Sequence, residues 1–247
     1  MSGLSSFGQP LRAAVIGASG GIGGALAARL AANPAVEAVF ALSRSPVPAD
    51  GKLIPGHLDT DDEASIAAAA EGLAAGGPLG LVIVASGLLH DGGALQPEKS
   101  FRHLEAAALT RSFQVNSIGP ALVAKHFLPL LERERKAVFA ALSARVGSIG
   151  DNRLGGWYGY RAAKAALNMT IRCLAIETAR NRKQTVCVGL HPGTVDSRLS
   201  QPFQRGVAPE KLFSPATATG HLLTVVDGLT PEDSGKVFAW DGREIPA

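Results

Sequence analysis

Short runs of apolar residues alternate along the chain with longer, alanine-rich amphipathic stretches. This alternation is typical of βαβ units arranged around a parallel sheet. Residues 81–85 are apolar without interruption, as expected of a strand that is covered on both faces. The pattern predicts strands at residues 12–16, 36–42, 52–58, 79–85, 137–143, 185–191 and 235–239.

Helices are expected between these strands, where apolar positions recur at helical spacing. The pattern predicts helices at residues 22–32, 62–73, 110–133 and 158–179. Pro120 and Pro129 fall inside the third of these, where a proline bends a helix or ends its regular part. Residues 196–213 lack clear periodicity and contain two prolines and a glycine, which favours a flap over a pocket.

Composition restricts the class of protein and its partners. Of the 247 residues, 46% are hydrophobic and 18% are charged, which is enough apolar material for a large core. The net charge is only +3 and no basic stripe is interleaved with aromatics, so we expect no nucleic-acid partner. No apolar run approaches the ~20 residues that span a bilayer, and residues 1–10 lack the features of a signal peptide. Cys173 and Cys187 lie in apolar stretches, which predicts buried free thiols in a reducing compartment. Together these features predict a cytoplasmic protein without a membrane partner.

A glycine-rich segment follows the first predicted strand and leads directly into a helix. It reads Gly17-Ala18-Ser19-Gly20-Gly21-Ile22-Gly23-Gly24. Without Cβ atoms the backbone can approach a pyrophosphate, and the free N–H groups of the helix start face its charge. The spacing fits both G-x-x-x-G-x-G and G-x-x-G-x-x-G, so the loop alone leaves the kind of dinucleotide enzyme open. With the strand and helix pattern, it predicts one Rossmann-like domain over residues 1–247, a doubly wound parallel α/β sheet of about seven strands with helices on both faces.

The residues after the second predicted strand bear on the choice of dinucleotide. An acidic residue there would bind a ribose 2′-OH, whereas an arginine would pair with a 2′-phosphate. The segment reads Ser43-Arg44-Ser45, with no carboxylate before Asp50. Arg44 therefore favours NADP over NAD, and an ordinary surface arginine is the alternative. Asp59, just past the third predicted strand, is a candidate for the adenine amino group or for an N-cap of the next helix.

Tyr160 and Lys164 lie one turn apart on the same face of the last predicted helix. A phenol titrates near 10, and a neighbouring ammonium favours its charged form, so we expect Lys164 to lower the pKa of Tyr160. A tyrosine tuned in this way can exchange a proton with a carbonyl or an alcohol. Because Y-x-x-x-K also occurs by chance on solvated helix faces, the weight of the pair depends on the motifs around it.

Those motifs together resemble the classical short-chain dehydrogenase/reductases over nearly the whole chain. The loop at residues 17–23 is similar to their T-G-x-x-x-G-x-G, with Ile16 in place of the threonine. Val84-Ala85-Ser86-Gly87 stands where the family has N-N-A-G and keeps only the last glycine. The segment at residues 192–197, Pro-Gly-Thr-Val-Asp-Ser, resembles the family's P-G-x-V-x-T. Within the family, residues 143–149, 151–164 and 241–246 are most similar to the C-factor and sniffer-type carbonyl reductases.

The resemblance implies hydride transfer between a nicotinamide cofactor, NADP(H) here, and a small carbonyl or alcohol substrate. It implies four catalytic residues: Asn116, Ser143, Tyr160 and Lys164. Tyr160 is then the general acid/base, Lys164 lowers its pKa and holds the ribose, Asn116 and a water feed protons to the lysine, and Ser143 binds the substrate oxygen with Tyr160. The cofactor-binding residues implied by the loop, the second strand and the resemblance are Gly17, Ser19, Gly21, Ile22, Gly23, Arg44, Asp59, Ala85, Ser86, Gly87, Tyr160, Lys164, Pro192, Gly193, Val195 and Ser197.

Several alternatives stay open at this point. The family spells the serine region S-x-x-G, and here Ala144 holds that register before Gly147, so Ser148 is an alternative to Ser143. An NADP-sensing or signalling protein on the same fold is the second hypothesis for the function, since fold does not fix function. An extended-type epimerase or dehydratase is less favoured, because few residues follow Lys164. A metal site is not expected, and the substrate and a homo-oligomeric state are left open.

Overall fold

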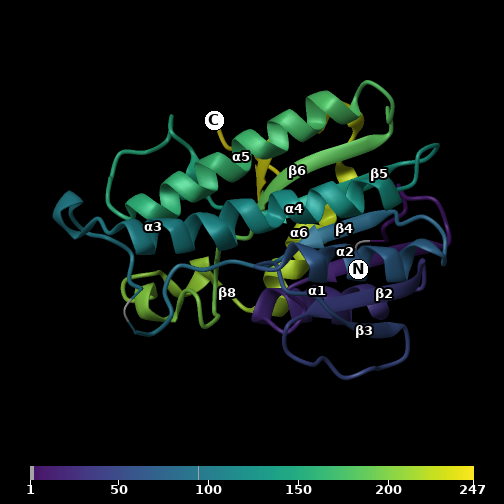
Figure 1. Cartoon of the computed structure of the whole chain (residues 1–247), viewed down its shortest axis with the longest axis horizontal. Coiled ribbons are helices and arrows are strands. Elements are labelled where there is room, and N and C mark those ends of the chain that lie inside the picture. The colour runs from purple at the N-terminus through teal and green to yellow at the C-terminus, as the bar shows by residue number, and fades with distance from the viewer. Residues whose placement is uncertain (1–2, 94) are drawn as a thin grey trace.

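The computed structural model describes residues 3–93 and 95–247. Seven parallel strands form one sheet in the order β3-β2-β1-β4-β5-β6-β9 (Figure 1). The strands are β1 (Leu11–Ile16), β2 (Val36–Ser43), β3 (Leu53–His57), β4 (Leu81–Val84), β5 (Ala137–Leu142), β6 (Thr185–His191) and β9 (Val237–Ala239). All seven predicted strands are confirmed, each to within a residue or two. The strand order reverses between β1 and β4, and such a point creates a ligand crevice at the carboxyl ends of the strands.

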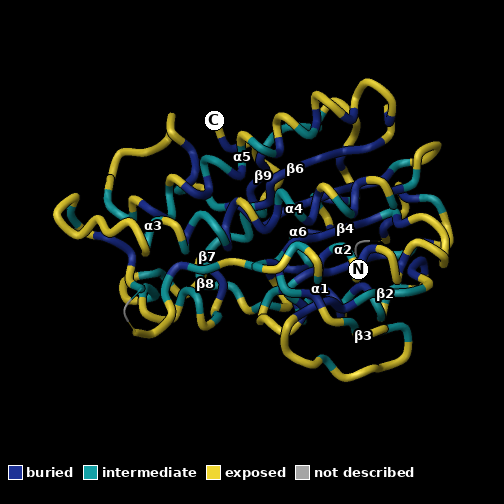
Figure 2. Tube along the Cα trace, in the orientation of Figure 1, coloured by how far each residue is buried: buried dark blue, intermediate teal, exposed yellow. Residues whose placement is uncertain are grey.

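Helices cover both faces of this sheet. Helices α1 (Gly21–Ala31) and α6 (Pro215–Gly228) pack on one face, and α2 (Glu63–Ala74), α4 (Gly119–Phe127) and α5 (Tyr158–Thr178) pack on the other. Successive residues of β5 alternate between the two cores: Val138 and Ala140 pack with α1 and α6, and Phe139 and Ala141 pack under the other three helices. Figure 2 shows the central strands buried between exposed loops, whereas the edge strand β3 is partly exposed. The predicted doubly wound α/β architecture is therefore present.

The helix expected at residues 110–133 is interrupted. It consists of α3 (Ala106–Phe113), a π-helical turn (Gln114–Ile118), α4 and a short 3₁₀ turn (Leu128–Leu130) that contains Pro129. Pro120 has no N–H to donate to the carbonyl of Asn116, so an α-helical bond is unavailable there and the wider turn is favoured. The two prolines thus act as expected, one at the wide turn and one at the end of the helix.

The segment at residues 196–213 is held at both ends by a small sheet of β7 (Thr194–Val195) and β8 (Leu212–Phe213). Helix α6 follows it and lies outside the predicted helices. Its start signals are nevertheless present, because the Ser214 hydroxyl accepts the Thr217 N–H at 3.1 Å and Pro215 opens the helix. The expectation of two buried thiols is wrong for Cys173, which is exposed on α5, whereas Cys187 is buried in β6.

Candidate active site

The glycine segment forms the turn between β1 and α1. Gly17 has a φ of +87°, and a Cβ there would lie 3.0 Å from the backbone nitrogen of Ser86. A Cβ on Gly23 would overlap the carbonyl oxygen of Gly17. Helix α1 has no side-chain cap and no acidic residue in its first turn, so its first N–H groups suit an anion. Ser19, Gly20, Gly21 and Ile22 are at least partly exposed at this helix end.

Arg44 follows β2 and lies beside the residues that follow β3. Its guanidinium group is 3.9 Å from the carboxylate of Asp59 and 3.7 Å from that of Asp61. Asp61 also pairs with Arg111 at 2.7 Å. The Arg44 side chain is 61% exposed, so it can turn to a phosphate while Arg111 continues to neutralise Asp61. The cap of α2 is Asp62, which makes the alternative interpretation of Asp59 as the N-cap wrong.

The residues after β4 lie against the glycine turn. The Ala85 N–H donates to the carbonyl of Ile16 at 2.8 Å. The Ser86 hydroxyl is buried and has no hydrogen-bond partner among the described residues. A buried polar group without a partner is unusual in a native protein. This hydroxyl also lies next to the Gly17 turn, where a side chain on Gly17 would occupy the space beside the backbone. Both observations fit a dinucleotide bound across this turn.

Asn116 is fully buried in the π-helical turn. Its amide nitrogen donates to the carbonyl of Leu88 at 2.7 Å and to that of Ser112 at 3.0 Å, and its oxygen accepts the Leu88 N–H at 3.0 Å. A Cβ on Gly87 would lie 3.6 Å from that same oxygen. Asn116 therefore ties the segment after β4 to the helix layer, although both asparagines of the family's N-N-A-G element are absent from it.

Tyr160 and Lys164 lie in the first two turns of α5. Lys164 is 2% exposed, its Nζ donates to the carbonyl of Leu142 at 2.7 Å, and it lies 5.7 Å from the centre of the Tyr160 ring. Burial lowers the pKa of Lys164 to about 7. Burial also raises the pKa of Tyr160 above its ordinary value. The expected lowering of the Tyr160 pKa is thus wrong for the protein alone, because desolvation outweighs a lysine that is directed to a backbone carbonyl.

The two serines that follow β5 are bonded to residues other than Tyr160. Ser143 is buried and its hydroxyl donates to the Asn168 side-chain oxygen at 2.6 Å. Asn168 follows Tyr160 by eight residues, about 12 Å along the helix axis. Ser148 is also buried, and its hydroxyl accepts the Asp151 N–H at 3.0 Å. Neither serine is bonded to Tyr160, and sequence reasoning missed Asn168, although it continues the face of Tyr160 and Lys164 by one more turn.

The segment after β6 lies beside the start of α1. Gly193 has a φ of +78°, and a Cβ there would lie 2.8 Å from the ring of Phe213. Val195 is buried in β7 and Pro192 is partly exposed. A Cβ on Gly21 would lie 3.7 Å from the Cβ of Ser197, so this segment reaches the start of α1. The structure thus brings the glycine turn and the predicted residues around Pro192, Gly193 and Ser197 to one edge of the sheet.

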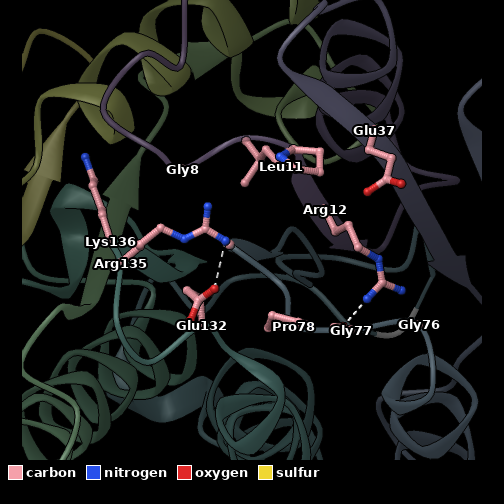
Figure 3. Close-up of a pocket in the computed structure, with 12 residues that line it drawn as sticks. Gly8, Leu11, Arg12, Glu37, Gly76, Gly77, Pro78, Glu132, Arg135 and Lys136 are labelled. Atoms are coloured by element: carbon pink, nitrogen blue, oxygen red, sulfur yellow. Dashed lines mark hydrogen bonds and ion pairs between the residues drawn. The ribbon is translucent and has the colours of Figure 1, made fainter.

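A cavity of about 210 Å³ lies at the opposite edge of the sheet (Figure 3). Arg12, at the start of β1, donates to the carbonyl of Gly77, and Arg135 pairs with Glu132 at 3.0 Å. Both guanidinium groups are therefore already bonded. Because ligands of open α/β sheets bind at the carboxyl ends of the strands, this cavity is separate from the site of Tyr160.

Comparison with known proteins defines the class to which this fold and site belong. Residues 12–207 match the short chain dehydrogenase family. The chain therefore belongs to this family, as its motifs predicted, and family members are oxidoreductases that use a nicotinamide cofactor.

Individual relatives agree with this assignment. C-signal of Myxococcus xanthus is 36% identical over 143 residues, which cover 58% of this chain and 81% of that protein. An uncharacterised oxidoreductase of Schizosaccharomyces pombe is 32% identical over 144 residues, which cover 54% of this chain and only 56% of that protein. The NADPH-bound carbonyl reductase from chicken fatty liver is 26% identical with a TM-score of 0.85, covering 100% of this chain and 98% of that one. Carbonyl reductase Sniffer of D. melanogaster shares the fold, with 21% identity, a TM-score of 0.83, and coverage of 97% and 100%.

In residues 3–93 and 95–247, no helix combines the length and the apolar character that are needed to cross a membrane.

Proposed function

We propose that this chain is a cytoplasmic NADP(H)-dependent oxidoreductase that transfers a hydride between the nicotinamide and a small carbonyl or alcohol substrate. Residues 1–247 would form one domain for cofactor binding and for chemistry. The observation that carries the proposal is the buried Lys164, whose pKa is lowered to about 7, one turn after Tyr160. Burial of an amino group costs free energy, and a group placed there despite this cost is typical of an active site.

The residues fit the cofactor in three places. The turn at Gly17, the uncapped start of α1 and the unpartnered Ser86 hydroxyl suit the pyrophosphate and its ribose. Arg44, beside Asp59, is exposed after β2, which supports pairing with a 2′-phosphate and a role of Asp59 at the adenine. A structural relative, the chicken reductase, is described as NADPH-bound, which also favours NADP.

The chemistry follows from the residues around the substrate oxygen. The bound nicotinamide supplies the hydride. Tyr160 donates its proton to the carbonyl oxygen while negative charge develops there, and its raised pKa keeps the phenol protonated until that moment. Lys164, with a pKa near neutrality, returns a proton toward Tyr160 and holds the ribose, and Asn116 orders the adjoining backbone. The hydroxyl of Ser143 is committed to Asn168, so polarisation of the oxygen falls to Tyr160.

A second candidate is a signalling protein that binds NADP without turning it over. The 36% identity to a protein named C-signal favours it. A protein that only binds the cofactor needs the glycine turn and Lys164 for the ribose, but it has no use for a tyrosine one turn before that lysine. The two functions differ in one measurement, because a sensor binds NADPH and leaves it unoxidised with every carbonyl.

The test is a screen of NADPH and NADH oxidation against aldehydes, ketones and quinones. On any substrate that is found, Tyr160→Phe should lower kcat by a factor of about 100 or more, because a general acid is lost. NADPH binding should be retained. Tyr158→Phe removes a hydroxyl from a neighbouring, 38% exposed tyrosine and serves as the control. NADPH binding without turnover across the whole panel would support the sensor instead.

A further inference from the structure

Glu98 is the one acidic side chain that is buried among the described residues, with 7% of the residue exposed. It lies in the loop between β4 and α3, far from Tyr160 in the sequence. It makes no ion pair in the described part of the chain. A buried carboxylate without an ion pair requires strong hydrogen-bond donors.

The donors come from the first turn of α5. The Gly159 N–H approaches both carboxylate oxygens of Glu98, at 3.1 and 3.3 Å. The Trp157 N–H donates to the Glu98 backbone carbonyl at 2.5 Å. Glu98 thus holds two N–H groups, one on each side of Tyr158, through its side chain and its backbone.

Helix α5 has no cap of its own. Its N-cap residue is Trp157, in the left-handed conformation with a φ of +49° and without a side-chain cap, and the first turn holds no acidic residue. The first N–H groups of a helix need acceptors, and a negative charge there interacts favourably with the helix dipole. Glu98 supplies the acceptor and the negative charge, although it belongs to a different segment. Gly159 leaves room for this approach, because a Cβ there would lie 2.9 Å from the Glu98 carboxylate.

The turn that Glu98 holds carries Tyr160. It also carries Trp157, whose ring contacts Tyr160 edge-on at 6.4 Å and Phe203 of the segment at residues 196–213 at 5.1 Å. A small displacement of this turn therefore moves the Tyr160 phenol and the Trp157 ring together. Misplacement of a reacting group by about 1 Å can cost a factor of about 100 in rate.

We propose that Glu98 is a positioning residue, which caps α5 from outside the helix and thereby places the Tyr160 phenol and the Trp157 ring. The proposal rests on the role of Tyr160 in the proposed function. Glu98 itself does not act on substrate or cofactor.

The experiment compares Glu98→Ala, Glu98→Gln and Glu105→Ala. Glu105 is an exposed glutamate of the same connection, at the start of α3, and is the control. Glu98→Ala should lower kcat by about 10-fold to 100-fold, with NADPH affinity changed less than twofold, because the glycine turn is untouched. Glu98→Gln keeps one acceptor oxygen and should recover most of kcat. A purely structural cap would lower Tm and leave kcat unchanged well below Tm.

Hydrogen exchange separates this proposal from the proposed function. Amides at residues 157–161 should exchange faster in Glu98→Ala than in the unaltered chain, and should be unchanged in Glu105→Ala. If the unaltered chain reduces no carbonyl, the proposed function fails and the exchange alone decides whether Glu98 holds the turn. Unchanged exchange at residues 157–161, or a kcat of Glu98→Ala within twofold of the unaltered chain, would overturn the proposal.

Discussion

Lys164 and Tyr160 are affected in opposite directions by the same surroundings. Loss of water disfavours the charged form of each, so the pKa of the lysine falls to about 7 and that of the tyrosine rises. The amino group donates to the carbonyl of Leu142 at 2.7 Å, and both a neutral and a charged amine have an N–H for this bond. Near neutral pH the pair therefore consists of a protonated phenol and a lysine that readily gains or loses a proton.

The lowered pKa of Lys164 predicts a pH dependence of stability. Between pH 7 and the ordinary value of 10.5, the unfolded chain binds the proton that the folded chain releases, so the free energy of unfolding rises with pH. Below about pH 7 the cost of burying the ammonium is fully present, and each tenfold loss of proton affinity corresponds to about 1.4 kcal/mol. Lys164→Met should therefore stabilise the protein at pH 6.5, and the gain should shrink as the pH rises toward 10.

Urea unfolding at both pH values measures this effect. Lys183→Met, at an exposed lysine, is the matched control and should show no such change between the two pH values. A gain in stability for Lys164→Met that is equal at pH 6.5 and pH 10 would contradict the lowered pKa.

Whether Ser143 binds the substrate oxygen also depends on single residues. Ser143 has one O–H to donate and gives it to Asn168, so we expect Ser143→Ala to lower Tm and to change kcat by less than tenfold. Loss of an oxyanion donor would instead cost a factor of about 10²–10³. Ala144 is partly exposed in the S-x-x-G register, and Ala144→Ser should raise kcat by restoring a hydroxyl there. A hundredfold loss of kcat in Ser143→Ala alone would show that Ser143 binds the substrate oxygen.

At the scale of elements, the π-helical turn and the first turn of α5 carry two of the proposed catalytic residues, Asn116 and Tyr160. Both depart from regular helix geometry, one next to Pro120 and the other at a left-handed Trp157. Each departure is stabilised by a residue that bonds backbone groups of a different segment. Asn116 does so for the residues after β4, and Glu98 does so for α5.

Asn116→Ala should loosen the connection between the π-helical turn and the end of β4. It leaves the N–H and the carbonyl of Leu88 without partners, at a cost of about 1–3 kcal/mol each when buried. We expect a lower Tm together with a lower kcat, measured by thermal unfolding and steady-state kinetics. Gln114→Ala, in the same turn and partly exposed, should change neither. A stable but inactive Asn116→Ala would show that Asn116 acts in proton transfer and not through the backbone.

At the scale of the whole molecule, the sheet collects distant segments at one edge. The glycine turn, Arg44, the residues after β4, the start of α5 and the segment after β6 all follow carboxyl ends of strands or face them. The strand order reverses between β1 and β4, and open α/β sheets bind their ligands at the carboxyl ends of the strands next to such a point. The opposite edge, with Arg12 and Arg135, carries none of these groups (Figure 3).

Cofactor preference belongs to this scale, because in the proposed function Arg44 and the glycine turn, which follow neighbouring strands, would contact the same cofactor. NADPH should bind at least tenfold more tightly than NADH, a difference of about 1.4 kcal/mol. Arg44→Ala should remove most of that difference, since the pairing with a 2′-phosphate is lost. Arg133→Ala, at an exposed arginine before β5, is the control. Fluorescence titration with NADPH and with NADH measures the two dissociation constants. Equal affinities in the unaltered chain would rule out the preference for NADP.

Much of the fold could be predicted because its signals are local. The buried strands appear as continuous apolar runs, and α5 spans Tyr158–Thr178 where the periodicity predicted residues 158–179. Helix α6 was missed because its apolar positions are diluted by threonines, although Ser214 and Pro215 mark its start. Cys173 was misjudged because an apolar neighbourhood in the sequence does not determine which face of a helix meets the core.

The sequence by itself determined the α/β architecture, the glycine turn, and the one-turn spacing of Tyr160 and Lys164, because each depends on residues close together in the chain. Only the tertiary structure decided the burial that lowers the pKa of Lys164, the bond from Ser143 to Asn168, and the cap that Glu98 places on α5. Glu98 and Gly159 are 61 residues apart. Contacts of that kind depend on how the layers pack, and packing leaves no periodic signal in the sequence.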